Sequence, residues 1–285
     1  MTFISIIIPT YRDNERLGKC LDAIAEQVNH ESQVEVIVAN NDPESEMPDF
    51  GKFPISLTIV NESIAGSYAA RNKGIEVAKG NFLLFTDSDC IPSKNWISKA
   101  QEIANDPQSD IIAGKVEVFS RTGSSYGKFD QVFAFPNEDY VQKEGFGVTA
   151  NLLVSRKVIE TTGGFKTGLL TGGDREFCHN ASTHGFTLTY DKDMSVFHPA
   201  RETWEEMSVK AKRFGGKIPQ DSSKALVFLK LIGKFRIRTS DFSTVHRADI
   251  SLIDRVKFLG IIARLRWVEA AESMRVFFGK APGRL

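Results

Sequence analysis

Two aspartates, Asp87 and Asp89, flank one serine directly after a short apolar run. Residues two apart in extended backbone point to the same side, so both carboxylates can face one cleft. Such carboxylates repel each other unless a cation or donor groups lie between them. Mg²⁺ or Mn²⁺, with phosphates and water completing its shell, would satisfy this arrangement. The alternative is a helix N-cap, because Asp and Ser also cap helices.

Polar clusters follow two other apolar runs of the chain. Residues 10–13 come after the run 4–8, and residues 40–42 come after the run 34–39. Strands that are apolar on both faces and separated by helices imply a mainly parallel sheet covered on both sides. Ligands of such sheets bind outside the carboxyl ends of the strands. The three clusters therefore predict one shared site.

The elements that must position these clusters alternate through the first 120 residues. Apolar runs predict strands at residues 4–8, 34–39, 55–60, 82–85 and 111–118. Helical spacing predicts helices at residues 17–28, 66–78 and 96–104. From 120 to 200 the pattern is less regular, with a helix expected at 174–182 and a strand at 187–197. After residue 200 the chain reads as mostly helical, and 252–278 is the longest helical candidate.

Charge is distributed unevenly along the 285 residues, although the formal net charge is zero. Residues 1–200 hold 18 Lys or Arg and 27 Asp or Glu, whereas residues 201–285 hold 18 and 9. A basic tail indicates an anionic partner, either nucleic acid or a membrane surface. No apolar run approaches the roughly 20 residues that span a bilayer. Three cysteines without a C-x-x-C pair fit a reducing compartment, so we expect a cytoplasmic protein.

Five motifs in order resemble the family 2 glycosyltransferases, over about residues 3–200. They are residues 5–12, 36–42, 66–75 and 85–89, and the glycine-rich segment that runs from 163 to Asp174. The resemblance implies an α/β fold of the GT-A type, a Rossmann-like sandwich with a mostly parallel central sheet. It implies a nucleotide-sugar-binding and catalytic domain at 1–215 and a basic helical C-terminal extension at 216–285.

The same resemblance implies roles for individual residues. Donor-binding residues would be Pro9, Thr10, Tyr11, Arg12, Asn41, Asp42, Arg71, Asp87, Ser88 and Arg213. Mn²⁺ or Mg²⁺ would be held by Asp87, Asp89 and His198. Arg213 and Lys217, beside the glycine pair 215–216, would form a lid over the diphosphate, or else simply end a helix.

Catalysis is expected at Asp174, which would act as the base for an inverting transfer. Here Gly173 precedes Asp174, where the family commonly has Glu. Two asparagines likewise precede Asp42, where the family commonly has two acidic residues. The expected donor is a UDP-, GDP- or dTDP-linked sugar, and the expected acceptor is a glycan or lipid-linked hydroxyl in cell-surface or exopolysaccharide synthesis.

Alternative interpretations stay open at this level. The chain could be an inactive glycosyltransferase-like scaffold, or a metal-dependent phosphatase or nucleotidyltransferase on a similar sheet. The basic helix at 252–278 could lie on an anionic membrane at the inner face, or pack on the domain or across a homodimer. Nucleic acid is not expected, because the basic residues do not match a known binding module.

Overall fold

The structure is a computed structural model that describes residues 2–217, 223–236, 241–242, 245–246 and 249–282. The chain divides into two units, each built from two separate segments. The first unit comprises Met1–Glu117 and Phe135–Pro199, and the second comprises Val118–Ala134 and Ala200–Leu285. The units are described one at a time.

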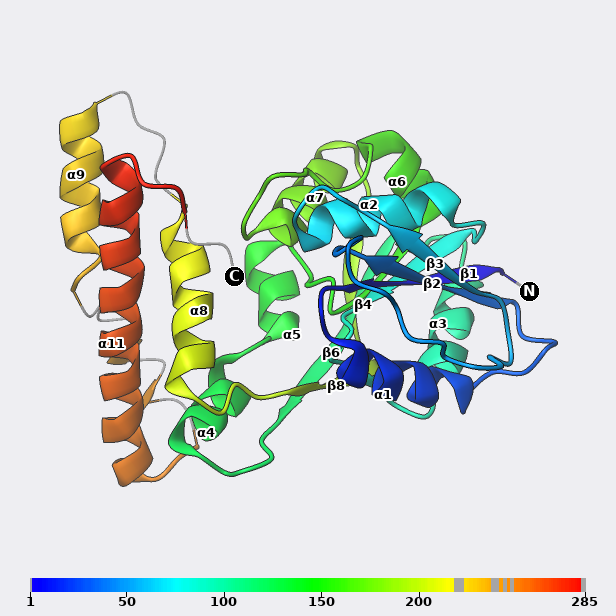
Figure 1. Cartoon of the computed structure of the whole chain (residues 1–285), viewed down its shortest axis with the longest axis horizontal. Helices are drawn as coiled ribbons and strands as arrows, with labels where there is room; N and C mark the ends of the chain where they lie inside the picture. Colours follow the sequence, from blue (N-terminus) through cyan, green and yellow to red (C-terminus); the bar gives the residue numbers. More distant parts are fainter. Residues whose placement is uncertain (1, 218–222, 237–240, 243–244, 247–248, 283–285) are drawn as a thin grey trace. The chain divides into compact units, whose positions relative to one another are not determined.

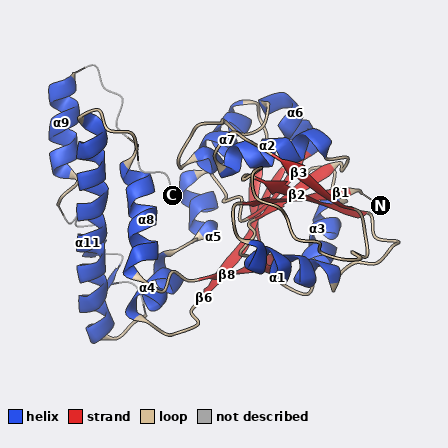
Figure 2. Cartoon of the chain, in the orientation of Figure 1, coloured by secondary structure: helices blue, strands red, loops and turns tan. Residues whose placement is uncertain are grey.

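An eight-stranded sheet, in the order β3-β2-β1-β4-β7-β6-β8-β5, forms the centre of the first unit (Figure 2). The pairs β1–β2, β1–β4 and β2–β3 are parallel, whereas β4–β7, β6–β7 and β5–β8 are antiparallel. Because β2 and β4 flank β1 on opposite sides, the chain reverses its winding there, which is where such sheets bind ligands. The strands are β1 (Ile4–Thr10), β2 (Val34–Asn40), β3 (Leu57–Asn61), β4 (Phe82–Thr86), β5 (Ile91–Pro92), β6 (Ile111–Phe119), β7 (Asn151–Ser155) and β8 (Leu188–Pro199).

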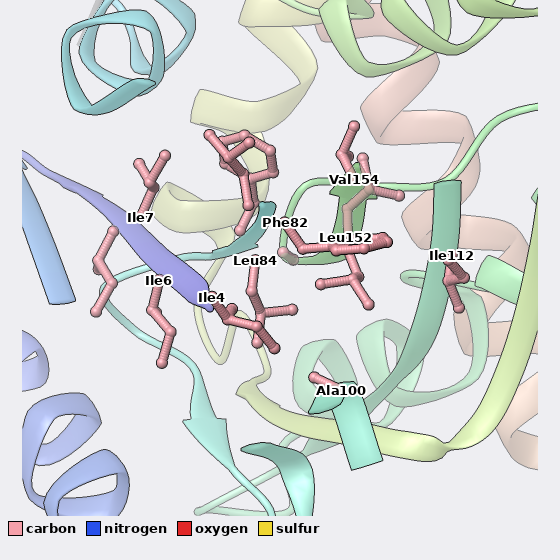
Figure 3. Packing of buried hydrophobic residues seen from close by; sticks show 14 of the residues in the cluster. Ile4, Ile6, Ile7, Phe82, Leu84, Ala100, Ile112, Leu152 and Val154 are labelled. Atoms are coloured by element: carbon pink, nitrogen blue, oxygen red, sulfur yellow. The ribbon is translucent and has the colours of Figure 1, made fainter. Parts of the chain in front are cut away.

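Helices cover both faces of this sheet, which is why its central strands are apolar on both sides. Every residue of β1, β2 and β4 is buried. Figure 3 shows the packing of Ile4, Ile6, Leu84 and Leu152 within this core. Figure 1 shows α1 and α3 on one side of the sheet and α2, α6 and α7 on the other. The helices are α1 (Asn14–Ala25), α2 (Ser67–Val77), α3 (Trp96–Ala104), α5 (Asn137–Asp139), the π-helix η1 (Tyr140–Glu144), α6 (Arg156–Thr162) and α7 (Gly173–Thr183).

Apart from the last two residues of β6, Val118 and Phe119, the regular secondary structure described in the second unit is helical. It contains α4 (Ser125–Phe133), α8 (Trp204–Gly215), α9 (Lys224–Gly233) and α11 (Leu252–Phe277). The long helix α11 packs against α8, α9 and α4 (Figure 1). Its Phe258 is 1% exposed and meets the rings of Phe129 and Phe133 edge-on, at centroid distances of 5.4 and 5.8 Å. These aromatic contacts give the unit its own apolar core.

The α/β fold with a mostly parallel sheet is confirmed, and so are the strands and helices predicted in the first 120 residues. The unit boundaries differ from the predicted division at residues 215 and 216. Helix α8 packs on α11, and the segment 118–134 joins the same core, so both belong to the second unit. That segment contacts residues more than 100 positions away, and local periodicity carries no information about such pairing.

The glycine pair at the end of α8, Gly215 and Gly216, does not form a strained turn. Gly215 is the last residue of the helix, and a Cβ there would lie 2.5 Å from the carbonyl oxygen of Glu269. Its own carbonyl accepts a 2.8 Å hydrogen bond from Ser273 Oγ, and Gly216 keeps a helical φ of −61°. Gly215 therefore allows α8 and α11 to approach closely, and the predicted lid around Arg213 and Lys217 stays a prediction.

Candidate active site

Asp87 and Asp89 lie in the turn that follows β4, and His198 joins them from the end of β8. One ligand atom from each of these three residues lies within 4.8 Å of the other two. His198 Nε2 is 3.5 Å from Asp89 Oδ1, and Arg16 Nη1 is 3.6 Å from Asp89 Oδ2. Two carboxylates and an imidazole form a donor set that suits Mn²⁺ or Mg²⁺. The predicted metal residues thus meet in space.

The orientation of His198 supports a cation at this position. Its Nδ1 lies 2.7 Å from the carbonyl oxygen of Pro199, and since a carbonyl can only accept, Nδ1 carries the hydrogen. In the neutral ring, Nε2 then presents a lone pair to the Asp89 carboxylate. Two facing acceptors need a cation or a proton between them, and a backbone partner that fixes the tautomer is typical of metal-ligating histidines. The ring is held in place by Phe135, at 4.6 Å between centroids.

Burial raises the pKa of Asp89 above its ordinary value, and the charge of a protonated His198 acts against this rise. Asp87 adds to the rise, because a second carboxylate nearby disfavours ionisation. A divalent cation held between the three residues would remove this repulsion. The cluster therefore fits a metal better than it fits three isolated side chains.

Arg71, on α2, lies beside Asp87 of the metal cluster, and its charge reaches the expected base Asp174. Its guanidinium is almost wholly buried and donates from Nη2 to Asp87 Oδ1. Its Nε has no hydrogen-bond partner among the described residues. A buried donor left unpaired is costly, so Arg71 Nε is available to a further acceptor. The charge of Arg71 also acts against the raised pKa of Asp174, which places the two side chains within electrostatic reach.

Asp174 lies in the first turn of α7, where the helix dipole favours a carboxylate. Its Oδ1 accepts a 2.8 Å hydrogen bond from Thr149 Oγ1. Burial nevertheless raises the pKa of Asp174, and the charge of Arg71 and the bond from Thr149 limit that rise. A carboxylate with a raised pKa that is fixed by one donor is suited to accept a proton.

The residues around Asp42 form a second group, at the ends of β1 and β2. Arg12 has a left-handed φ of 52°, and its Nε lies 2.6 Å from Asp42 Oδ2. The guanidinium lies 5.1 Å from the centre of the Tyr11 ring, which is 45% exposed. The side chain of Asn40 holds the backbone of Asp42 through two hydrogen bonds of 3.0 Å. Its Oδ1 accepts from Asp42 N, and its Nδ2 donates to Asp42 O. An exposed ring beside a fixed carboxylate can stack on a nucleobase and accept its N–H.

The other predicted donor residues are distributed differently. The side chain of Asn41 bonds to Glu62 O, Ile64 O and Gly66 N, so it ties the loop before α2 to the end of β2. Thr10 is buried at the end of β1, and its Oγ1 has no partner among the described residues. Pro9 lies within β1, Ser88 is buried between the two aspartates, and Arg213 lies on α8 in the second unit. Their donor contacts stay predictions.

Three residues near the site escaped the sequence analysis. Arg16, one turn into α1, pairs with both Asp13 and Asp89. Tyr68 lies three residues before Arg71, so helical spacing could have placed both on one face of α2. Thr149 precedes β7, a strand without a clear pattern in the sequence, and no local signal marks it.

Comparison with known proteins agrees with this geometry. Residues 5–165 match Glycosyl transferase family 2, which is more than half of the chain. Glycosyltransferase AglE of Haloferax volcanii is 30% identical over 207 residues, covering 70% of this chain and 68% of AglE. The poly(ribitol-phosphate) beta-glucosyltransferase of Bacillus spizizenii is 25% identical, and the match covers 72% of this chain but 33% of that protein.

Two solved structures show the same fold. The mannosyltransferase PcManGT from Pyrobaculum calidifontis, in complex with GDP-Man and Mn²⁺, has a TM-score of 0.52 at 17% identity, covering 100% of this chain and 76% of that chain. S. aureus TarS 1–349, in complex with UDP-GlcNAc, has a TM-score of 0.53 at 14% identity, covering 97% and 90%. The chain therefore belongs to glycosyltransferase family 2, and its fold is of the GT-A type.

Proposed function

We propose that this enzyme transfers a sugar from a nucleotide-diphosphate donor to an acceptor hydroxyl, with inversion at the anomeric carbon. The observation that carries the proposal is the placement of Arg71 beside Asp87 of the metal cluster and within electrostatic reach of Asp174. A donor that reaches the cluster and an acceptor that reaches Asp174 would thus share one site.

Asp87, Asp89 and His198 would hold Mn²⁺ or Mg²⁺. When bound, that ion would neutralise the charge of the departing diphosphate. Arg71 holds the Asp87 carboxylate through Nη2, and its unpartnered Nε can donate to a phosphate oxygen. Bound GDP-Man with Mn²⁺ in PcManGT supports a donor of this class.

Asp174 removes the proton of the acceptor hydroxyl in the proposed reaction. The acceptor oxygen then attacks the anomeric carbon, the bond to the phosphate oxygen breaks, and the nucleoside diphosphate leaves with the electron pair. One displacement from the face opposite the leaving group inverts the configuration. The raised pKa of Asp174 makes it a stronger base than an exposed aspartate, and Thr149 fixes its orientation.

Asp42 and Tyr11 would recognise the nucleobase of a UDP-, GDP- or dTDP-linked sugar. In the structure Arg12 already occupies Asp42 Oδ2, so the base must share that carboxylate or displace the guanidinium. The acceptor is a cell-surface or exopolysaccharide glycan, free or lipid-linked, at the cytoplasmic face of the membrane. The named action of the Bacillus spizizenii relative on poly(ribitol phosphate) supports an acceptor of this kind.

A thermal-shift panel of nucleoside diphosphates and their sugars, with and without Mn²⁺, tests the donor site. A ligand at 100 times its Kd should stabilise the enzyme by about 2.7 kcal/mol. Asp89→Asn should lose the Mn²⁺-dependent part of this stabilisation. Asp193→Asn, which removes an exposed carboxylate, serves as the matched control. Undiminished metal-dependent binding by Asp89→Asn would contradict the metal assignment.

A further inference from the structure

The second unit exposes large apolar side chains far more densely than the first. Among the described residues, eleven are exposed in the second unit and four in the larger first unit. Large contiguous apolar patches on a protein surface mark interaction sites, whereas single exposed apolar residues are normal. The arrangement of these residues on the helices of the second unit therefore decides whether they form such a site.

Helix α9 is apolar on two sides. Val227 and Leu231 are buried, whereas Leu226, Leu229 and Ile232 are exposed at 48%, 63% and 45%. The three exposed residues recur every third position, so they line one face of the helix. The helix contains no acidic residue. Packing within the unit accounts for its buried side but not for this outer one.

The exposed side of α11 has the same character. Its exposed positions are spaced mostly three or four residues apart, with adjacent pairs at 252–253 and 256–257, as expected for one face of a helix. This stripe contains apolar, small and basic residues and no acidic one, because Asp254, Glu269 and Glu272 are all at least partly buried. The stripe consists of Leu252, Ile253, Val256, Lys257, Gly260, Arg264, Trp267, Ala271 and Arg275.

The two helices lie side by side and antiparallel (Figure 1). Phe228 of α9 is 5.9 Å from Phe277 at one end, and the ring of Phe235, just after α9, is 5.0 Å from Trp267 further along α11. We call Leu226, Leu229, Ile232, Ile253, Val256 and Trp267 the α9–α11 surface. Trp267, 62% exposed, is the large aromatic residue within it.

The charge of the second unit distinguishes between two candidate partners of this surface, a second copy of the chain and an anionic membrane. The second unit holds 20 basic and 10 acidic residues, a net charge of +10, and the first unit is −10. A second copy docked through the same surface would bring two strongly positive units together, and such like-charge contacts are unfavourable. An anionic bilayer would attract the unit and accept its apolar side chains, and tryptophan is enriched at bilayer interfaces.

We propose that the α9–α11 surface docks this protein on an anionic membrane, with both helices lying in the plane of the interface. Among the described helices, none combines the length and apolarity needed to cross a bilayer. The proposal adds to the proposed function by naming the surface that contacts a membrane. Only the biological purpose of this docking rests on the proposed function. The surface itself is independent of the metal cluster.

Co-sedimentation of the full chain with vesicles tests the proposal. We expect binding to phosphatidylcholine vesicles that contain phosphatidylglycerol, little binding to pure phosphatidylcholine, and weaker binding at high salt. The variant Leu226→Gln/Leu229→Gln/Ile232→Gln should lower the vesicle partition coefficient by roughly tenfold or more, because it removes inserted apolar area. Ile59→Gln/Val77→Gln alters exposed apolar residues of the first unit and should bind like the original protein.

Trp267 provides a second readout. Trp96 is fully buried and Trp204 partly buried, so a blue shift of the emission on anionic vesicles should come from Trp267 and disappear in Trp267→Phe. Binding by the α9 variant that equals that of the original protein, or an equal loss in the control, would overturn the proposal. A dimer in light scattering that the α9 variant dissociates would also overturn it, in favour of a second copy.

The same variants should keep the Mn²⁺-dependent thermal shift with nucleoside diphosphates. Loss of vesicle binding with this shift intact assigns the defect to the surface. A missing shift in the original protein, together with its normal binding to anionic vesicles, would instead contradict the proposed donor site and leave the docking surface standing.

Discussion

The phenolic oxygen of Tyr68 accepts a 2.9 Å hydrogen bond from the backbone nitrogen of Gly173. A Cβ on Gly173 would lie 2.5–2.8 Å from three carbons of the Tyr68 ring, closer than real contacts allow. Gly173 stands immediately before Asp174, the proposed catalytic base. The ring of Tyr68 thus occupies the space that a side chain at residue 173 would need, which gives a physical reason for the glycine.

Substitution of Gly173 should therefore destabilise the fold. Gly173→Glu forces the Tyr68 ring or α7 to move, and overpacking of this kind costs about 1–3 kcal/mol. The melting temperature measured by calorimetry should fall by several degrees. Gly18→Glu, within α1 where a Cβ meets nothing within 4 Å, should leave it nearly unchanged. Tyr68→Ala combined with Gly173→Glu should recover part of the loss, and strict additivity would contradict the assigned contact.

Removal of the Tyr68 hydroxyl should affect turnover more than donor affinity. Tyr68→Phe leaves the N–H of Gly173 unpaired, which costs about 1–3 kcal/mol and loosens the first turn of α7. Because Asp174 sits in that turn, we expect a roughly tenfold fall in kcat with the KM for the donor unchanged. Steady-state transfer assays measure both constants. Tyr190→Phe is the matched control, and an equal change in KM would assign Tyr68 to donor binding instead.

The raised pKa of Asp174 predicts the sign of two pH effects. In the proposed mechanism transfer needs the ionised carboxylate, so the rate should fall as the pH drops through a pKa that lies above the ordinary value for aspartate. Thr149→Val removes a hydrogen bond that lowers this pKa and should move the acid limb of the kcat profile to higher pH. An unshifted limb would mean that another group controls it.

Asp174→Asn should slow transfer by about 10²–10⁴-fold and leave the fold intact. The folded state favours protonated Asp174, so the stability it contributes is lost as the pH rises through its raised pKa. Asparagine cannot ionise, so this variant should melt at or above the temperature of the original protein at neutral pH, and its advantage should shrink in acid. Melting curves across pH measure this, and a large loss of stability at neutral pH would contradict it.

His198→Ala should weaken Mn²⁺-dependent donor binding by roughly tenfold or more. The variant removes one of three candidate ligands and leaves both carboxylates in place. Titration calorimetry with Mn²⁺ and a nucleoside diphosphate measures the loss. His184→Ala changes a histidine at the end of α7 that lies outside the cluster and should bind normally. Equal metal affinity in both variants would limit the site to the two aspartates.

Much of the site could be predicted because its residues lie at the ends of strongly apolar strands. The runs that became β1, β2 and β4 predict a buried parallel sheet, and the polar residues after Thr86 follow from the same pattern. His198 is 109 residues from Asp89, and its place in the cluster depends on the path of β8, which spacing alone does not give. Thr149 contacts Asp174, and Tyr68 contacts Gly173, from distant parts of the chain. Helical spacing places Tyr68 on one face of α2 with Arg71, but it does not reveal either of these tertiary contacts.

The second unit was the harder part to predict. Helical spacing identified α11, but a helix that is apolar on its buried side and apolar and basic on its exposed side has no single dominant stripe. Helix α4 gave no clear signal, because its aromatic residues are explained by Phe258, which lies more than 120 positions later. The positive charge of residues 201–285, in contrast, could be counted directly from the sequence.

The helical unit contains the C-terminal part of the chain and also the segment 118–134, which is inserted within the sequence of the first unit. A chain shortened to end at residue 199 would still contain α4. Its Phe129 and Phe133 would be exposed, because their contacts with Phe258 would be lost. Such a fragment should aggregate, whereas one that also replaces 118–134 with a short polar loop should stay monodisperse. The helical unit therefore cannot be removed by a single truncation. Exchanging it between related enzymes would require replacing both of its chain segments together.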